Sequence, residues 1–170
     1  KNDLIASFLS LLSKDDKALF EQVISFLTGL NYVPQKQRVS GFSLSFKHVQ
    51  TQKIIAKMGV HGKDNKAFLS IKFFGCKTVP EKYRDALRQE IEARNGQYCG
   101  PLRNAVEKNR CGSCNTCTGG GVGYYYSYPD GREILRCGAY PIPISDLSAE
   151  DIDLLKALLL EQHAYFLSIA

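Results

Sequence analysis

Phe42-Ser43-Leu44-Ser45-Phe46-Lys47 is the stretch that decides the fold, because apolar and polar residues alternate along it with a period of two. Such alternation is typical of a β-strand with one buried face and one solvated face. The same period returns at 53–58 and at 66–74, and turn-like segments separate the three runs. We therefore expect an antiparallel meander with one apolar face and one lysine-rich face.

Helical patterns flank this meander on both sides. The expected helices cover 2–12, 13–29, 78–94 and a C-terminal segment that begins near Ser148. Three of them open with a capping box, in which a hydroxyl and an acid three residues later satisfy the free amides of the first turn: Ser13 with Asp16, Thr78 with Glu81, and Ser148 with Asp151. The fold class predicted is α+β: an antiparallel sheet flanked by helices, with a ribbon-like metal-binding hairpin and a C-terminal helix.

The chain of 170 residues has the length of one domain. We expect a helix-helix-meander-helix unit over 1–96 and a cysteine hairpin with the C-terminal helix over 97–170, packed as one compact body. No apolar run is long enough to span a bilayer, and the first residues lack the pattern of a secretory leader. These features favour a cytoplasmic protein without a membrane partner.

The cysteines are spaced for metal binding. Three of the six, Cys111, Cys114 and Cys117, fall within seven residues at two-residue intervals. Disulfides gain most from closing long loops, whereas this spacing brings thiolates to one point, as metal ligation requires. The sequence therefore favours a metal over disulfides, and Cys76, elsewhere in the chain, is expected to be a buried thiol.

A hairpin follows the three cysteines and supplies a fourth. It runs from Gly123 through Pro129-Asp130-Gly131 to Cys137, and a two-residue turn at Asp130-Gly131 would set Cys137 opposite Tyr124. The stretch 99–137 resembles a zinc ribbon, which implies zinc held by Cys111, Cys114, Cys117 and Cys137, with Cys99 as the alternative ligand. An iron–sulfur cluster, and with it a redox sensor, is the alternative reading of the same spacing.

The first unit resembles the bacterial YdhG-like domains, a frataxin-like group. Three features carry the resemblance: the strand Phe42–Phe46, the strand that ends at Phe73-Phe74, and Tyr83-Arg84. The resemblance implies a helix-meander-helix order over about half the chain. No acidic iron-binding ridge accompanies it, so it assigns no functional residue.

Catalysis has little support in the sequence. The three histidines, His48, His61 and His163, are isolated from one another and from any nucleophile, and no phosphate-binding glycine loop is present. We lean toward a non-catalytic binding or regulatory domain that is stabilised by a metal.

Two surfaces could bind a partner. The first, for a small molecule or a protein, comprises Tyr124, Tyr126, Arg132 and Arg136 on the hairpin. The alternative, for single-stranded nucleic acid, comprises Lys47, Lys53, Lys57, Lys66, Phe68 and Lys72 on the polar face of the meander, with Phe74 beside them. The charge distribution points to the second surface as the positive one, since residues 31–77 hold nine basic residues and one acid.

Overall fold

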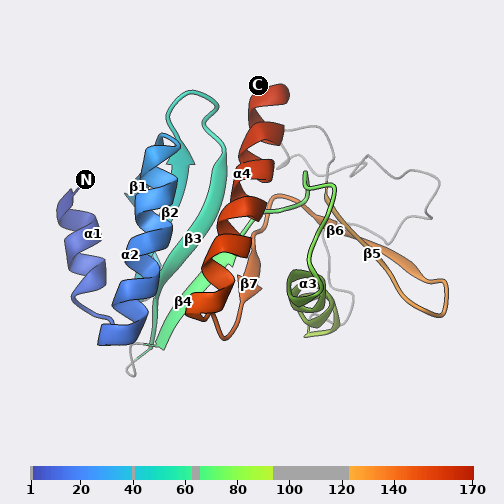
Figure 1. The fold of residues 1–170 in the computed structure, drawn as a ribbon, viewed down its shortest axis with the longest axis horizontal. Coiled ribbons are helices and arrows are strands. Elements are labelled where there is room, and N and C mark those ends of the chain that lie inside the picture. The colour runs from blue at the N-terminus through green and yellow to red at the C-terminus, as the bar shows by residue number, and fades with distance from the viewer. Residues whose placement is uncertain (1, 40, 63–65, 94–122) are drawn as a thin grey trace.

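The computed structural model describes residues 2–39, 41–62, 66–93 and 123–170. Within them the chain forms a five-stranded antiparallel sheet, a two-stranded hairpin and four α-helices, which confirms the α+β class (Figure 1). The helices are α1 (Asn2–Leu9), α2 (Lys14–Gly29), α3 (Glu81–Ala93) and α4 (Ile152–Ser168), the last preceded by the 3₁₀ turn η2 (Ala149–Asp151). The strands are β1 (Tyr32–Lys36), β2 (Phe42–His48), β3 (Ile54–His61), β4 (Lys66–Ile71), β5 (Gly123–Ser127), β6 (Glu133–Cys137) and β7 (Ile142–Ile144).

The predicted meander is the centre of the sheet. Its strands β2, β3 and β4 are neighbours in the order β1-β2-β3-β4-β7. The two edge strands, β1 and β7, were not expected, because each contains a proline, Pro34 or Pro143, that reads as a break. Proline lacks the amide hydrogen that an inner strand must donate, so both strands suit an edge. The two edges of the sheet are thus formed by segments that lie far apart in the sequence.

The core lies between the sheet and the helices. Figure 1 shows α2 and α4 lying across one face of the sheet, with α1 beside α2. Two rows of buried apolar side chains cross four strands beneath these helices: Leu44, Met58, Leu69 and Ile144, and next to them Phe46, Ala56, Ile71 and Ile142. Burial of this apolar area is the main force that holds the fold together. We call this side of the sheet the closed face.

The capping boxes predicted for α2 and for the C-terminal helix are both present. The Asp16 amide donates to Ser13 Oγ over 3.1 Å, and Ser148 donates its amide to Asp151 Oδ2 over 2.8 Å. Lys82 of α3 adds an ion pair of 2.6 Å to the same Asp151 oxygen. The start of α4 is therefore tied to α3 as well as capped.

Helix α3 begins later than expected. Its first backbone bonds run from the amides of Tyr83 and Arg84 to the carbonyl of Pro80, so the turn starts at Pro80 and not at Thr78. The buried residues Tyr83, Leu87 and Ile91 face the rest of the molecule, and the helix packs against β7 and β5. It therefore joins the edge of the large sheet to the hairpin.

The β5–β6 hairpin is present, but its register differs from the predicted one. Tyr124 pairs with Arg136, and Cys137 pairs with Gly123. The loop has three residues instead of two: the Tyr128 amide donates to the Arg132 carbonyl, and Gly131 has a φ of +85°. A type I turn followed by a left-handed glycine is the usual three-residue hairpin loop, and the extra residue shifts the pairing by one.

No helix of the described residues is long and apolar enough to cross a bilayer.

Candidate functional site

The predicted metal ligands lie mostly beyond the part of the chain that the structure describes. Cys99, Cys111, Cys114 and Cys117 fall within 94–122, and only Cys137 is placed. It ends β6, is half-buried, and its sulfur accepts the Ala139 amide over 3.5 Å. An amide directed at a cysteine sulfur stabilises a thiolate, which is the form that binds a metal. Among the described residues, no group of three or more Cys, His, Asp or Glu side chains could hold an ion.

Cys76 has the environment of a structural thiol. Its sulfur lies 3.3 Å from the Leu158 carbonyl of α4. Burial, together with the nearby charge of Glu161, raises the pKa of the Cys76 thiol to about 12. A thiol with so high a pKa is neutral at physiological pH and is a poor metal ligand and a poor nucleophile.

The four hairpin residues predicted to bind a ligand are divided between two environments. Tyr124 and Arg136 are 2% exposed and belong to the core side of the hairpin. The Tyr124 hydroxyl donates to the Tyr140 carbonyl over 3.0 Å, and Arg136 forms an ion pair of 2.9 Å with Glu90 of α3. These contacts fasten the hairpin to the molecule.

Arg132 is exposed, whereas Tyr126 is half-buried and packs against the core from the same face of the hairpin as Tyr124. Arg132 pairs with Asp130 over 2.7 Å, and its guanidinium lies 4.6 Å from the Tyr128 ring centroid. The Tyr126 and Tyr128 rings meet edge to face at 4.8 Å. The hairpin tip is thus a small cluster of aromatic and charged groups, in which the Arg132 guanidinium is already paired with Asp130.

Three of the lysines predicted to bind nucleic acid, Lys47, Lys57 and Lys66, lie on the side of the sheet opposite the closed face, whereas Lys53 precedes β3 and its carbonyl accepts a hydrogen bond from the His48 amide. Strand register places them there, because directly paired residues of an antiparallel sheet share a face. One row across the sheet runs through Gln35, Ser45, Lys57, Ser70 and Pro143, and Lys47 follows Ser45 by two residues on β2. We call this side, with Lys66, Phe68 and His61, the open face.

The described helices contact the closed face. The Phe8 ring of α1 stacks on Phe42 at 6.2 Å, and α4 meets β1 through His163 and Tyr32. By contrast, the ends of the open-face row, Gln35 and Pro143, are exposed. Within the row Ser45 is buried, and Lys57 and Ser70 are half-buried, so the open face is most accessible toward its ends.

An aromatic pair stands on the open face. The Phe68 and His61 rings are stacked, with centroids 4.1 Å apart and planes 20° apart. Phe68 can lie flat against the sheet because Gly59 is opposite it: a Cβ on Gly59 would come within 2.8 Å of the Phe68 ring and would overlap the Phe42 carbonyl oxygen. Lys66 pairs with His61 in the register, so a basic group borders the stack.

The charge around this surface has one sign. The described residues between 31 and 77 include eight Lys or Arg and no Asp or Glu. Lys47, Lys57 and Lys66 form no ion pair with any other described residue. Acidic side chains lie on the helices instead, for example Asp15, Asp16 and Glu21 on α2. The two faces of the sheet therefore differ in electrostatic potential as well as in burial.

Phe74 does not share the open face, contrary to expectation. Its ring lies under α4, with centroids 5.7 Å from Tyr165 and 5.8 Å from Phe166. The strand period fails here because β4 ends at Ile71, and residues 73–77 turn onto α4. The Gly75 amide donates to Gln162 Oε1 over 2.8 Å, and the Lys77 amide donates to Glu161 Oε1.

A buried aromatic cluster was missed in the sequence. His48, at the end of β2, and His163 of α4 have ring centroids 5.3 Å apart, and each contacts the Tyr32 ring of β1. His163 Nδ1 lies 3.3 Å from the Tyr32 hydroxyl, and His48 Nδ1 accepts the Thr51 amide over 3.2 Å. No sequence signal could pair two histidines so far apart once β1 itself was missed.

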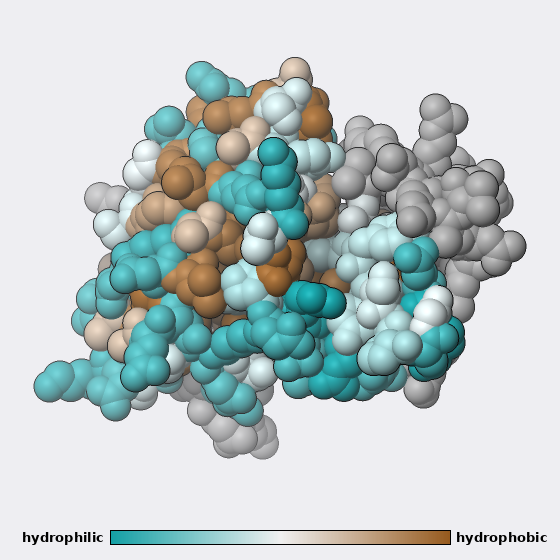
Figure 2. Space-filling view, turned by 45° about the vertical axis from the view of Figure 1, so that its right-hand side comes forward, coloured by the Kyte–Doolittle hydropathy of each residue, from teal (hydrophilic) through white to brown (hydrophobic). Residues whose placement is uncertain are grey.

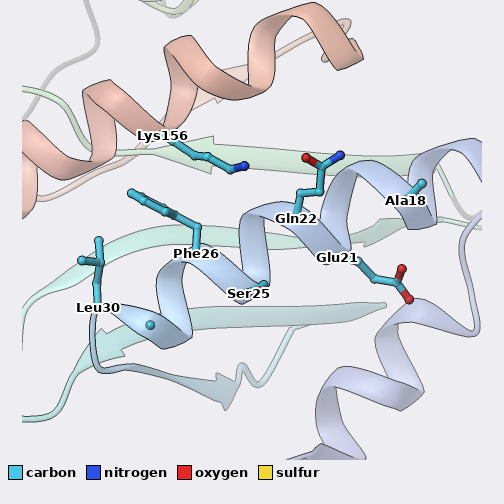
Figure 3. A pocket seen from close by; sticks show the side chains of 8 residues that line it. Ala18, Glu21, Gln22, Ser25, Phe26, Leu30 and Lys156 are labelled. Atoms are coloured by element: carbon cyan, nitrogen blue, oxygen red, sulfur yellow. The ribbon is translucent and has the colours of Figure 1, made fainter.

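The helical side carries a groove between α2 and α4 of about 610 Å³. Figure 3 shows Lys156 reaching toward Gln22 above the Phe26 ring, with Glu21 pointing away from α4. Apolar side chains are also visible across this side of the molecule in Figure 2, and Leu154, Leu160 and Leu167 of α4 are exposed. The lining holds one cation and one anion, so the groove selects for neither charge.

Comparisons with protein-family models, curated proteins and solved structures find no match to this chain. The resemblances to zinc ribbons and to YdhG-like domains therefore stay predictions.

Proposed function

We propose that this chain binds single-stranded nucleic acid on the open face of its sheet. The observation that carries the proposal is the combination on one surface of unpaired lysines, an accessible aromatic stack and a complete lack of carboxylates across β1–β4. Lysines neutralise phosphates, and aromatic rings stack on unpaired bases. The flat surface of a sheet lets several nucleotides lie side by side.

The arrangement assigns a role to each group. Lys57 in the row and Lys47 beside it lie on adjacent strands, where they would follow the phosphates. The Phe68–His61 stack, nearer the other end of β3 and β4, would receive a base. Lys66 beside the stack would meet the next phosphate. Lys53 and Lys72, at the strand ends near Lys47, would extend the positive field.

The open face is favoured over the hairpin as the binding surface because Tyr124 and Arg136 are occupied by contacts within the molecule. A surface whose polar groups already have partners gains less from a ligand than one whose charges have none. A small molecule or protein at Tyr126 and Arg132 is therefore the lesser candidate.

We further propose that Cys111, Cys114, Cys117 and Cys137 bind one zinc ion that stabilises the hairpin, and that the protein works in a reducing compartment such as the cytoplasm. The hydrogen bond from the Ala139 amide to the Cys137 sulfur supports this role. Elemental analysis of anaerobically purified protein should give one zinc and no visible absorption. Iron with a broad visible band would mean that the cysteines hold an iron–sulfur cluster instead of zinc. Absence of any metal would contradict the proposal.

Binding is tested with a fluorescently labelled, unstructured oligonucleotide titrated by anisotropy at several salt concentrations. We expect affinity to fall steeply with salt, and the variant Lys57→Glu to lose about tenfold and to show a shallower salt slope. Lys14→Glu is the matched control: it makes the same charge change at an exposed position on α2, on the helical side. Equal losses in both variants would mean that only net charge matters, and salt-independent binding would contradict the proposal.

A further inference from the structure

The cluster of Tyr32, His48 and His163 fastens the C-terminal half of α4 to β1 and β2. His48 is 3% exposed and Tyr32 is 1% exposed. The three rings form a closed triangle, with centroid separations of 5.0, 5.3 and 5.6 Å. The triangle joins two strands of the sheet to a helix that lies more than a hundred residues later in the sequence.

The contacts of the two rings favour neutral imidazoles. His48 Nδ1 accepts the Thr51 amide, so a proton on that nitrogen would set two donors against each other and break the bond. His163 Nδ1 faces the Tyr32 hydroxyl, which can donate to a neutral ring. A charge on the half-buried His163 ring would lie 5.3 Å from the buried His48 ring.

Among the described residues, no negative charge is paired with either ring. Tyr32 is the titratable group that β1 contributes, and burial raises its pKa, so it stays neutral. Helix α4 adds Lys156, two turns before His163, and on the neighbouring α2 the Glu21 carboxylate points away from α4 (Figure 3). No described carboxylate makes an ion pair with either histidine. Buried charges without a partner are costly to the folded state.

We propose that Tyr32, His48 and His163 form an acid-sensitive latch, in which protonation of His163 releases the end of α4, His163–Ser168, from β1 and β2. The inference is independent of the proposed nucleic-acid binding, since the latch lies on the closed face.

The direction of the pH dependence follows from linkage. Burial, and then the nearby His48, hold the pKa of His163 below its usual value of about 6.5. The unfolded or released state therefore binds a proton more readily than the latched state. The stabilisation by the latch is complete above pH 6.5 and declines as the pH falls below 6.5. Carboxylates titrate at lower pH, so the window between pH 5 and 6.5 reports the protonation of His163.

The test is amide hydrogen exchange of the whole chain at pH 7.5 and pH 5.0, with rates corrected for the intrinsic effect of pH. We expect protection of 163–168 to fall severalfold at pH 5.0 relative to 152–158, because His163 takes up a proton more readily once α4 is released. His163→Phe keeps a ring against Tyr32 but cannot take a proton, so this loss should vanish. His61→Gln, on the open face, should lose protection as the unaltered chain does.

Two results would overturn the latch: equal protection of 163–168 at both pH values, or an undiminished loss in His163→Phe. Should that variant fail to fold, NMR titration of the histidine rings in the unaltered chain decides the question. The latch requires His163 to titrate below a histidine of the unfolded chain, together with the amide shifts of 163–168. Titration of His163 without any change at those amides would refute the proposal.

Discussion

The two faces of the five-stranded sheet are built from the same strands but serve opposite purposes. On the closed face, rows of apolar side chains lie beneath α2 and α4 and are almost fully buried. On the open face, the residues between them are serines, lysines and a single stacked aromatic pair. Successive residues of a strand point to opposite sides, so each position is committed to either stability or surface chemistry.

The two faces differ in how directly the role of a residue can be inferred from its position. A buried aromatic on the closed face is explained by packing, whereas Phe68 on the open face is not covered by any described helix. Lysines along a strand are also used to keep a sheet from aggregating, so their presence alone is weak evidence. The lack of Asp and Glu across β1–β4 strengthens the evidence from the lysines, because solubility alone would be served by mixed charges.

The largest expected difference between the two faces comes from truncating neighbouring residues of β2 that point to opposite sides. Phe46→Ala removes a fully buried ring and should lower the free energy of unfolding by about 3–5 kcal/mol. Lys47→Ala, one residue along β2, should change it by less than about 0.5 kcal/mol. Urea unfolding followed by circular dichroism measures both. Similar losses in the two variants would contradict the assignment of the faces.

A second change tests the packing of Phe68 over Gly59 on the open face. In Gly59→Ala the new methyl group would meet the Phe68 ring and the Phe42 carbonyl, so we expect a loss of roughly 1–3 kcal/mol in unfolding free energy. The displaced ring should also weaken oligonucleotide binding. Gly29→Ala, which has open space around its Cβ on α2, is the control and should not destabilise the chain. Unchanged stability in Gly59→Ala would argue against the close packing described.

A third change separates stacking from burial on the open face. Phe68→Leu keeps an apolar cover over Gly59 but cannot stack on a base. Oligonucleotide affinity should fall about tenfold, in line with the value of one stacked base, while unfolding free energy changes by about 1 kcal/mol or less. Anisotropy titration and urea unfolding give the two numbers. A loss of stability without a loss of affinity would assign Phe68 to packing alone.

The smallest expected effect concerns the first turn of the helix that covers the closed face. Burial would raise the pKa of Asp151, but hydrogen bonds from Lys82 and Ser148 outweigh it and lower that pKa. Its stabilising contribution is therefore present above about pH 3.9 and is lost as the pH falls below that value. Asp151→Asn should cost about 1 kcal/mol at pH 7 and less at pH 3. A cost that does not change with pH would show that the charge is unimportant.

The sequence was informative where a pattern is local. Alternation in β2, β3 and β4 and the capping boxes at Ser13 and Ser148 predicted the centre of the sheet and the starts of two helices. The edge strands were missed because Pro34 and Pro143 disguise them, although an edge tolerates proline. The hairpin register was wrong because loop length, not strand composition, sets the pairing.

The candidate sites divide in the same way. Period two alone predicted the lysine face, and strand register then added His61 and removed Phe74. Contacts between distant segments were beyond prediction, as in the pairing of His48 with His163 and of Arg136 with Glu90. Three of the four proposed zinc ligands lie outside the described residues, so the metal stays a sequence-based prediction.

The prolines of β1 and β7 have a consequence for association. Each removes a hydrogen-bond donor from the outermost strand, at Pro34 on one border of the sheet and at Pro143 on the other. A foreign strand that tried to extend the sheet would find its ladder interrupted on either side. The protein should thus resist fibril formation at high concentration. A partner of the sheet should bind to one of its faces and not add a strand to its edge.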